Sequence, residues 1–366
     1  MSEQYYLECI EDIHSFRKHR DEWDRFVRAH HCEPYNRTTD WLCCWWDSYA
    51  KDKRVFIYIV RDGKQGQILA CLPLVVSRQN FSGFPVAIVE ILGKGIGNED
   101  FPLTNAGTEY LDAIFYDLGK RTRWHVVRFS HLRKGAAVDA LLRFVQGNQH
   151  NFEQWTVGNV CVKLQGNFDD YYRNRSRNFK KNLRHYRNRL KNEGEYRFER
   201  YSFCANTDEI FGKAKKIAER SWQHRNGTGH FNSNGGRSFM ENLFELWSGH
   251  NFGQEYSFLT VNDKSIAYLF GIKCGTVYHA IDVAYDVDYS KYSPGRLLYA
   301  EVIKNVHKEP QIEIFDFGGG TGYHRDYGNF SYQVINLVFY RKDLWSELVY
   351  RARKSDMLDR IKKFVK

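Results

Sequence analysis

The chain has 366 residues, of which 42% are hydrophobic and 27% charged, a mixture typical of folded proteins and not of disordered or fibrous ones. This length exceeds what one core usually organises and predicts two domains. No apolar run approaches the ~20 residues that cross a bilayer, and the N-terminus has no basic-then-apolar leader pattern. We therefore expect a soluble, cytoplasmic protein.

The net charge of +10 is concentrated in one segment. From Arg173 to Asn192 there are nine Lys or Arg residues and no Asp or Glu. The rest of the chain is almost neutral, so the basic character is a local feature that needs a local explanation.

The eight cysteines are scattered without a Cys-x-x-Cys pair, which disfavours a metal site or a disulfide framework. Several have apolar neighbours, as in Ala70-Cys71-Leu72. They are predicted to be buried, reduced thiols, and we expect no metal.

In the first half, helices are predicted where apolar residues recur on one face, and strands where β-branched and aromatic residues cluster. The Asp62-Gly63 pair predicts a hairpin turn. The expected order is helix, helix, hairpin, strand, helix and strand, over residues 21–28, 41–49, 55–60 with 68–76, 86–92, 110–120 and 124–129.

The basic segment is predicted to form a helix over 177–193, with Ser176 as N-cap and Gly194 as its stop. Its apolar face is formed by Phe179, Leu183, Tyr186 and Leu190. A solvated amphipathic helix would explain this face but not the complete lack of acids. An anionic partner is favoured: coenzyme A phosphates, an acidic carrier protein, tRNA or an anionic acceptor.

The second half repeats the order of hairpin, strand, helix and strand. The predicted ranges are 256–261 with 266–272, then 277–283, 296–307 and 312–317. This shared order indicates two α/β domains of related design, joined near 147–166.

The helix after residue 293 begins with Ser293-Pro294-Gly295-Arg296 and has no acid in its first turn. Free amides, the positive end of the helix dipole and Arg296 together favour a site for phosphate or another anion. An ordinary strand-to-helix turn is the alternative.

The strand that ends at Asp316 runs into Phe317-Gly318-Gly319-Gly320-Thr321-Gly322. Taken alone, this run resembles the first motif of the S-adenosylmethionine methyltransferases. That interpretation needs a helix after the glycines, whereas Tyr323-His324-Arg325 and the residues that follow show no helical apolar period.

Four segments together resemble the CelD/FemAB-related branch of the GNAT acyltransferases. They are the basic run that begins Ser176-Arg177-Asn178-Phe179, then Tyr285-Asp286, then Ser293 to Leu298, and Asp316-Phe317-Gly318. The N-terminal half adds Trp45-Trp46 before a hairpin that ends Leu72-Pro73-Leu74.

This resemblance implies an α/β (α+β) fold of tandem GNAT-like domains, here 1–160 and 161–366, each a mostly antiparallel mixed sheet flanked by helices. It implies transfer of an acyl group from acyl-CoA or an acyl carrier protein to an amine or hydroxyl acceptor, in cell-envelope or polysaccharide pathways. Aminoacyl transfer from charged tRNA is one alternative. A non-catalytic nucleic-acid-binding protein that uses the basic helix is another.

Residues for such a reaction can be named. Asp316 and His324 are the candidate bases, Tyr323 a candidate proton donor, and Asp282 a further carboxylate that could face the cleft. Each also has a structural interpretation: a cap for Asp316, a surface position for His324, packing for Tyr323 and a hydrogen bond for Asp282.

The donor is expected to bind at residues of the helix start and the basic helix, namely Ser293, Gly295, Arg296, Lys180 and Arg184. The chain departs from the family pattern at Gly319, where Arg is usual, at Thr321, near which an acid is usual, and at His324, where Lys is usual. A changed acceptor, a changed donor or a lost activity could follow. A metal site at Asp286 and Asp288 is disfavoured because no nucleotide-binding half surrounds them.

Overall fold

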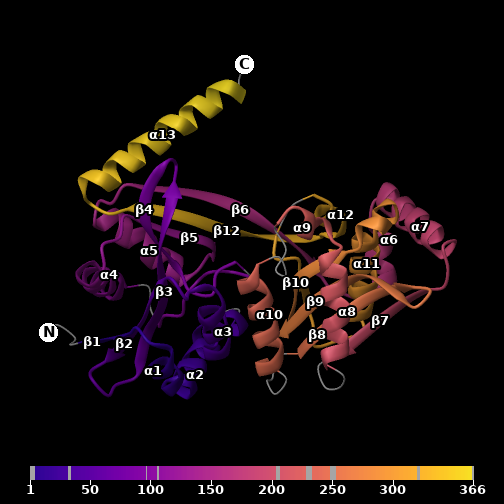
Figure 1. Ribbon diagram of the computed structural model, residues 1–366, viewed down its shortest axis with the longest axis horizontal. Coiled ribbons are helices and arrows are strands. Elements are labelled where there is room, and N and C mark those ends of the chain that lie inside the picture. The colour runs from indigo at the N-terminus through magenta and orange to yellow at the C-terminus, as the bar shows by residue number, and fades with distance from the viewer. Residues whose placement is uncertain are drawn as a thin grey trace. The chain divides into compact units, whose positions relative to one another are not determined.

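The computed structural model describes residues 5–31, 34–95, 97–104, 107–202, 207–227, 233–247, 253–319 and 322–364. The chain divides into two compact units, Met1–Val157 with Gln333–Lys366 and Gly158–Tyr332. Figure 1 shows the elements of both units. Strands β6 (Phe152–Lys163) and β12 (Phe330–Tyr340) each contribute residues to both.

The first unit contains a mixed sheet in the order β1-β2-β3-β4-β5-β12. Its neighbouring strands are antiparallel except β4 and β5, which are parallel. Besides β12, the strands are β1 (Tyr5–Ile10), β2 (Arg54–Asp62), β3 (Ile68–Phe81), β4 (Phe84–Ile91) and β5 (Val126–Arg133).

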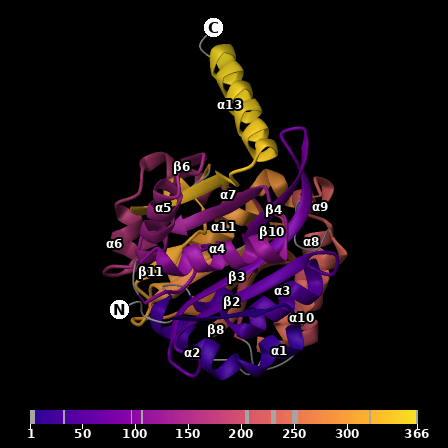
Figure 2. The ribbon, with the colours of Figure 1, turned by 90° about the vertical axis from the view of Figure 1, so that its left-hand side faces the viewer.

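Two helices, α4 (Glu109–Arg121) and α5 (Ala136–Gly147), cover one face of this sheet, as Figure 2 shows. Alternate residues of β3, including Leu72 and Leu74, pack in the same cluster as Ile114 and Leu141 of these helices. The remaining helices of the unit are α1 (Ile13–Lys18), α2 (Arg20–His30), the 3-10 helix η1 (Pro34–Arg37), α3 (Thr39–Tyr49) and α13 (Leu344–Phe364).

The second unit has a sheet in the order β6-β11-β10-β9-β8-β7. Again one neighbouring pair is parallel, β10 with β11, and the others are antiparallel. Besides β6, its strands are β7 (Tyr196–Ser202), β8 (Gly253–Val261), β9 (Lys264–Cys274), β10 (Val277–Tyr285) and β11 (Ile314–Asp316).

Two helices of the second unit, α7 (Arg177–Lys191) and α11 (Pro294–Val306), contact each other and share one apolar cluster. Leu269 of β9 belongs to that cluster, whereas the alternate residues Tyr268 and Phe270 contact the ring of Tyr256 on the opposite face. The other helices are α6 (Phe168–Arg173), α8 (Thr207–Glu219), α9 (Trp222–Arg225), α10 (Asn234–Trp247), the 3-10 helix η3 (Val287–Tyr292) and α12 (His324–Tyr327).

The predicted fold class and the repeated order are confirmed. Each unit has an antiparallel hairpin, a third strand, a helix and a parallel fourth strand: β2-β3-β4-α4-β5 and β8-β9-β10-α11-β11. The second hairpin turns more tightly than predicted, since Asn262 and Asp263, with φ of 48° and 62°, form a two-residue turn.

The predicted basic helix is present and begins where expected. The Ser176 hydroxyl accepts a hydrogen bond from the amide of Phe179 at 3.1 Å, as an N-cap does. The helix ends at Lys191 with Asn192 as C-cap, so the predicted end at residue 193 is two residues too late and Gly194 lies beyond the stop.

Residues 333–366 were assigned to the second domain from the sequence, but they cluster with the first unit. The physical reason is β12, which pairs antiparallel with β5 from Val334 opposite Arg133 to Tyr340 opposite Val126. Nothing in the local pattern around residue 330 identifies a strand that returns to an earlier sheet.

In the described part of the chain, no helix combines the length and the apolar character needed to cross a membrane. Of the six described cysteines, five are buried and Cys9 is partly exposed. Cys32 and Cys204 lie outside the described residues.

Candidate active site

The parallel strands β10 and β11 separate after a short pairing. Their register ends at His279 and Asp316, while β10 continues beside β9 to Tyr285. The chain that leaves β11 follows β6 instead, because the amide of Val160 donates to the oxygen of Gly319 at 3.1 Å. The strands therefore diverge on the side where β10 leads into α11.

The first turn of α11 lies next to the end of β10. A Cβ atom built on Gly295 would lie 3.5 Å from Cδ1 of Tyr285 and 3.9 Å from the hydroxyl of Tyr323. Gly295 thus keeps the backbone of the helix start close to two phenol rings. The sequence analysis named Gly295 as part of the helix start. The structure shows in addition that it faces Tyr285 and Tyr323.

The start of α11 has the features of an anion site. Ser293 adopts the left-handed conformation, with φ 49° and ψ 54°, and Pro294 takes the first helical position. The first turn carries no acid and contains Arg296. The unpaired amides of a helix start and its positive dipole end both favour negative charge.

His324 lies in an aromatic cluster beside α11. Its ring stacks on Phe317 with 4.7 Å between centroids and 18° between planes, and meets the edge of Tyr299 at 5.4 Å. Tyr323 lies at 4.8 Å in a perpendicular arrangement. The surface position considered for His324 is therefore excluded.

Both ring nitrogens of His324 are buried, and neither has a hydrogen-bond partner among the described residues. Burial, reinforced by the positive charge of Arg296, lowers the pKa of His324 to about 4. The imidazole is neutral at pH 7 and offers one donor and one acceptor. A buried polar ring left without partners indicates a place for a ligand.

Tyr323 keeps its proton at neutral pH. Burial raises the pKa of its hydroxyl to about 12, although the nearby Arg296 opposes this shift. The Arg296 guanidinium lies 4.8 Å from the centre of the Tyr323 ring. Tyr323 is thus placed to donate a proton and is held by a cation on its face.

Among the described residues, Arg296 has one charged partner, Asp326 of α12, at 2.9 Å. The two side chains are 28% and 45% exposed, so solvent weakens this pair and leaves the guanidinium accessible to a ligand. The Tyr327 hydroxyl donates to the Arg296 carbonyl at 2.5 Å and ties α12 to the helix start.

Asp316 lies on the opposite face of the sheet from His324. Phe315 packs in the cluster with α7 and α11, so the next residue along β11 points away from it. One Asp316 oxygen accepts from the Gly318 amide at 2.8 Å and the other from the Tyr332 hydroxyl at 2.6 Å. Asp316 therefore caps the glycine turn.

Asp282 is also engaged in a structural contact. It is 7% exposed and accepts a hydrogen bond at 2.5 Å from the hydroxyl of Tyr268, which lies on the face away from α11. The structure does not bring Asp282 together with Tyr323 and His324. The carboxylate instead makes a structural hydrogen bond, which was the alternative considered for it.

Lys180 and Arg184 occupy α7, not the helix start. The Lys180 ammonium donates to the Arg173 carbonyl at 2.8 Å, and Arg184 is exposed. The other basic residues with known partners are Arg187, which pairs with Glu301 at 2.8 Å, and Arg189, which lies over the Tyr292 ring.

The carboxylate pair at Asp286 and Asp288 has no features of a metal site. Asp286 caps the amide of Asp288 at 3.1 Å and pairs with Lys264 at 2.9 Å. Among the described residues, no group of three or more His, Cys, Asp or Glu side chains is arranged to hold a metal ion.

The sequence missed Tyr299 and Tyr332. Tyr299 follows Arg296 by three positions, so the two residues share one face of the predicted helix. This spacing could have identified Tyr299 from the sequence. Tyr332 had no such signal because it belongs to β12, a strand that was not predicted. Asn159 of β6 donates to the Tyr332 hydroxyl at 3.0 Å, which completes a chain of contacts to Asp316.

Residues 177–332, all within the second unit, match the family profile described as the acetyltransferase (GNAT) domain. The second unit is therefore similar to a GNAT domain over residues 177–332, in agreement with the resemblance to the GNAT acyltransferases. A sequence comparison with curated proteins finds no match.

Solved structures support the same fold over nearly the whole chain. FemX has a TM-score of 0.59 and 10% identity, with 94% of this chain and 100% of FemX covered. A tandem GNAT protein from the clavulanic acid biosynthesis pathway has a TM-score of 0.51 and 10% identity, with 91% and 98% covered. The C-terminal domain of an Agrobacterium fabrum protein assigned as a lysylphosphatidylglycerol synthetase has 0.54 and 10%, with 94% and 97% covered.

Proposed function

We propose that the second unit transfers an acyl group from a thioester, acyl-CoA or an acyl carrier protein, to an amine or hydroxyl acceptor. The observation that carries this proposal is the group formed by Gly295, Arg296, Tyr323 and His324 at the start of α11. It combines an anion site, a protonated phenol and a neutral imidazole, which are the groups that direct acyl transfer needs.

The donor binds through its negative charge at the start of α11. Phosphate oxygens accept hydrogen bonds from the free amides of the first turn and from Arg296. Gly295 has no side chain, so a phosphate or the pantetheine arm can approach the backbone beside Tyr285 and Tyr323.

The reaction needs no covalent enzyme intermediate. The acceptor nitrogen or oxygen attacks the thioester carbonyl carbon, and its proton passes to the neutral imidazole of His324. The tetrahedral intermediate then collapses, the carbon–sulfur bond breaks, and the leaving thiolate takes the proton of Tyr323. Two groups that stay in the correct protonation state at pH 7 thus serve the two proton transfers.

A second candidate is aminoacyl transfer from charged tRNA, which the resemblance implies and to which the FemX likeness adds support. One feature favours it: Arg177, Lys181 and Arg184 follow one another at helical spacing on the side of α7 opposite Phe179 and Leu183. No described carboxylate pairs with these three exposed cations, so they are available to a polyanion.

Calorimetry of the full chain against acetyl-CoA, a long-chain acyl-CoA, an acyl carrier protein and an aminoacyl-tRNA tests both candidates. A thioester that binds saturably, and binds less well to the Arg296→Gln protein, supports the main proposal. The matched control is Asp326→Asn, which breaks the same ion pair and keeps the cation.

Binding of aminoacyl-tRNA alone, with product formed on an amine acceptor, would favour the second candidate. Salt-dependent binding of any RNA without turnover would instead favour a non-catalytic role for α7. Acceptors are then screened by measuring the free thiol that is released on acyl transfer. The candidates are saccharides of a cell-envelope or polysaccharide pathway and other small molecules.

A further inference from the structure

A basic groove lies in the first unit, on the sheet formed by β2, β3 and β4. It has a volume of about 590 Å³, which lies within the range of small-ligand sites. Four cations line it, Lys53, Arg54, Arg78 and Arg123, against one carboxylate, Asp52. None of the residues of the α11 site lines this groove.

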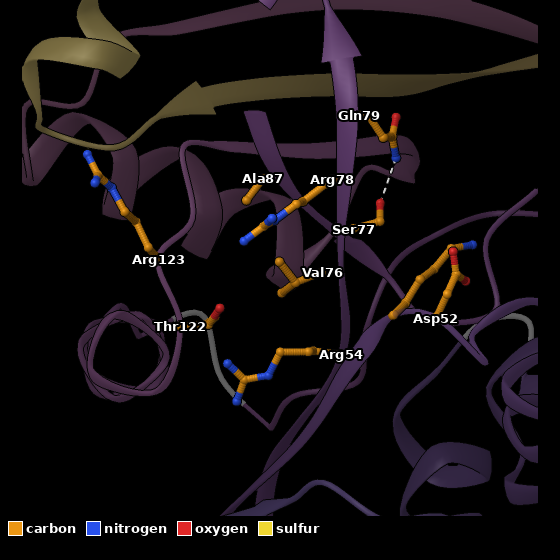
Figure 3. A pocket seen from close by; sticks show the side chains of 10 residues that line it. Asp52, Arg54, Val76, Ser77, Arg78, Gln79, Ala87, Thr122 and Arg123 are labelled. Atoms are coloured by element: carbon orange, nitrogen blue, oxygen red, sulfur yellow. Dashed lines mark hydrogen bonds between the residues drawn. The ribbon is translucent and has the colours of Figure 1, made fainter. Parts of the chain in front are cut away.

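Arg78 occupies the centre of this groove. It extends from β3 and also lines an adjoining groove of about 460 Å³, together with Arg123 and His125. Figure 3 shows the side chains of Arg78 and Arg54 on the same side of β3, with Thr122 and Arg123 farther to the left. Arg123 points away from the other two in this view.

Arg78 and Arg123 have no charged partner among the described residues. Both side chains are exposed. Arg54 is partly engaged, since it contacts Glu11 at 3.2 Å and donates to the Arg121 carbonyl at 2.9 Å. Arginines that line one groove without acidic partners repel one another, and an anion bound in the groove would relieve this repulsion.

Neutral donors are also present: Ser77 lines this groove, and His125 lines the adjoining one. The Ser77 hydroxyl oxygen accepts from the Gln79 amide at 2.7 Å and keeps its own proton for another acceptor. His125 is neutral because burial lowers its pKa, and its Nδ1 accepts from the Ala87 amide at 2.9 Å. The donors come from several elements and directions, which suits tetrahedral phosphate better than a planar carboxylate.

We propose that this groove binds the diphosphate group of a small ligand, with Arg78 as the central contact and Arg54 and Arg123 on either side. A groove of about 590 Å³ is larger than one phosphate needs and leaves room for the ester group. The first unit is then a second ligand-binding domain and not only a structural partner of the acyltransferase unit.

The test is calorimetry with inorganic pyrophosphate on the full chain that carries Arg296→Gln, so that the anion site of α11 is weakened beforehand. Inorganic phosphate and malonate serve as comparison anions. We expect one saturable site that prefers pyrophosphate, and an affinity that falls with added salt. In the same background, Arg78→Gln weakens pyrophosphate binding at least ~10-fold, the scale of lost charge-assisted hydrogen bonds.

The matched control is Arg25→Gln, an exposed residue of α2 whose replacement changes the net charge equally. It should leave the affinity unchanged, and thermal melts of both variants should match that of the parent protein. The proposal is overturned by any of three results: no saturable heat, malonate bound as tightly as pyrophosphate, or equal loss in the Arg25→Gln and Arg78→Gln proteins. Sedimentation with phosphatidylglycerol vesicles adds a fourth, since Arg78-dependent vesicle binding without pyrophosphate binding would assign the groove to a membrane surface.

Discussion

The imidazole of His324 lies nearly parallel to the ring of Phe317, at 4.7 Å between centroids, and neither of its nitrogens has a partner in the described part of the chain. Packing therefore fixes the position of this ring while its polar atoms stay available. This combination distinguishes His324 from Asp316, whose two oxygens are both hydrogen-bonded.

The His324→Phe variant separates packing from chemistry. Phenylalanine keeps the stacked ring and removes the two buried nitrogens, so stability should be unchanged or slightly higher. If His324 accepts the acceptor's proton, turnover should fall at least ~10²-fold. Thermal melts and thiol-release kinetics with an identified donor measure the two effects. Turnover close to that of the parent protein would assign the base to another residue.

His324 should also contribute to the pH dependence of stability. Its pKa is about 4 in the folded protein, below the ~6.5 of an unfolded chain, so the unfolded state binds more protons between these values. Stability should therefore decrease as the pH falls from about 6.5 to about 4. Urea titrations across this range should show a smaller decrease for His324→Phe. Parallel curves for the two proteins would contradict the assignment.

Asp316→Asn should affect stability more than catalysis. The substitution weakens two charge-assisted hydrogen bonds, from the Gly318 amide and the Tyr332 hydroxyl, and should lower the free energy of unfolding by ~1–3 kcal/mol. Turnover per folded molecule should change less than ~10-fold. A loss of ~10² in turnover with an unchanged melt would restore Asp316 as the base.

Gly295→Ala should weaken donor binding without lowering the stability of the fold. The new methyl group would lie 3.5 Å from Tyr285 and 3.9 Å from the Tyr323 hydroxyl, which are ordinary contacts. Alanine also stabilises a helix relative to glycine by up to ~1 kcal/mol. The fold should therefore persist while the donor binds more weakly. Calorimetry with the donor decides, and unchanged affinity would place the donor away from this turn.

Much of each unit's central pattern was predictable because it is local. The hairpins, the helix start at Pro294 and the cap at Ser176 depend on neighbours within a few residues. Strands β1, β6, β7 and β12 were missed, since their partners are distant in sequence and their alternation is weak. The candidate site residues also could not be assigned to one face of the sheet from local patterns. Tyr323 and His324 could be named, but only the three-dimensional register shows that Asp316 faces the other side.

The return of β12 to the first unit has a consequence for the order of synthesis. β5 ends at Arg133, but the strand that pairs with it begins near residue 330 and is made after the whole second unit. While the chain emerges from the ribosome, this edge of β5 has no native partner strand. An unpaired strand edge can form non-native pairs. The second unit, whose residues are contiguous from 158 to 332, can complete its own sheet first. We therefore expect the first unit to mature slowly and the second unit to mature fast.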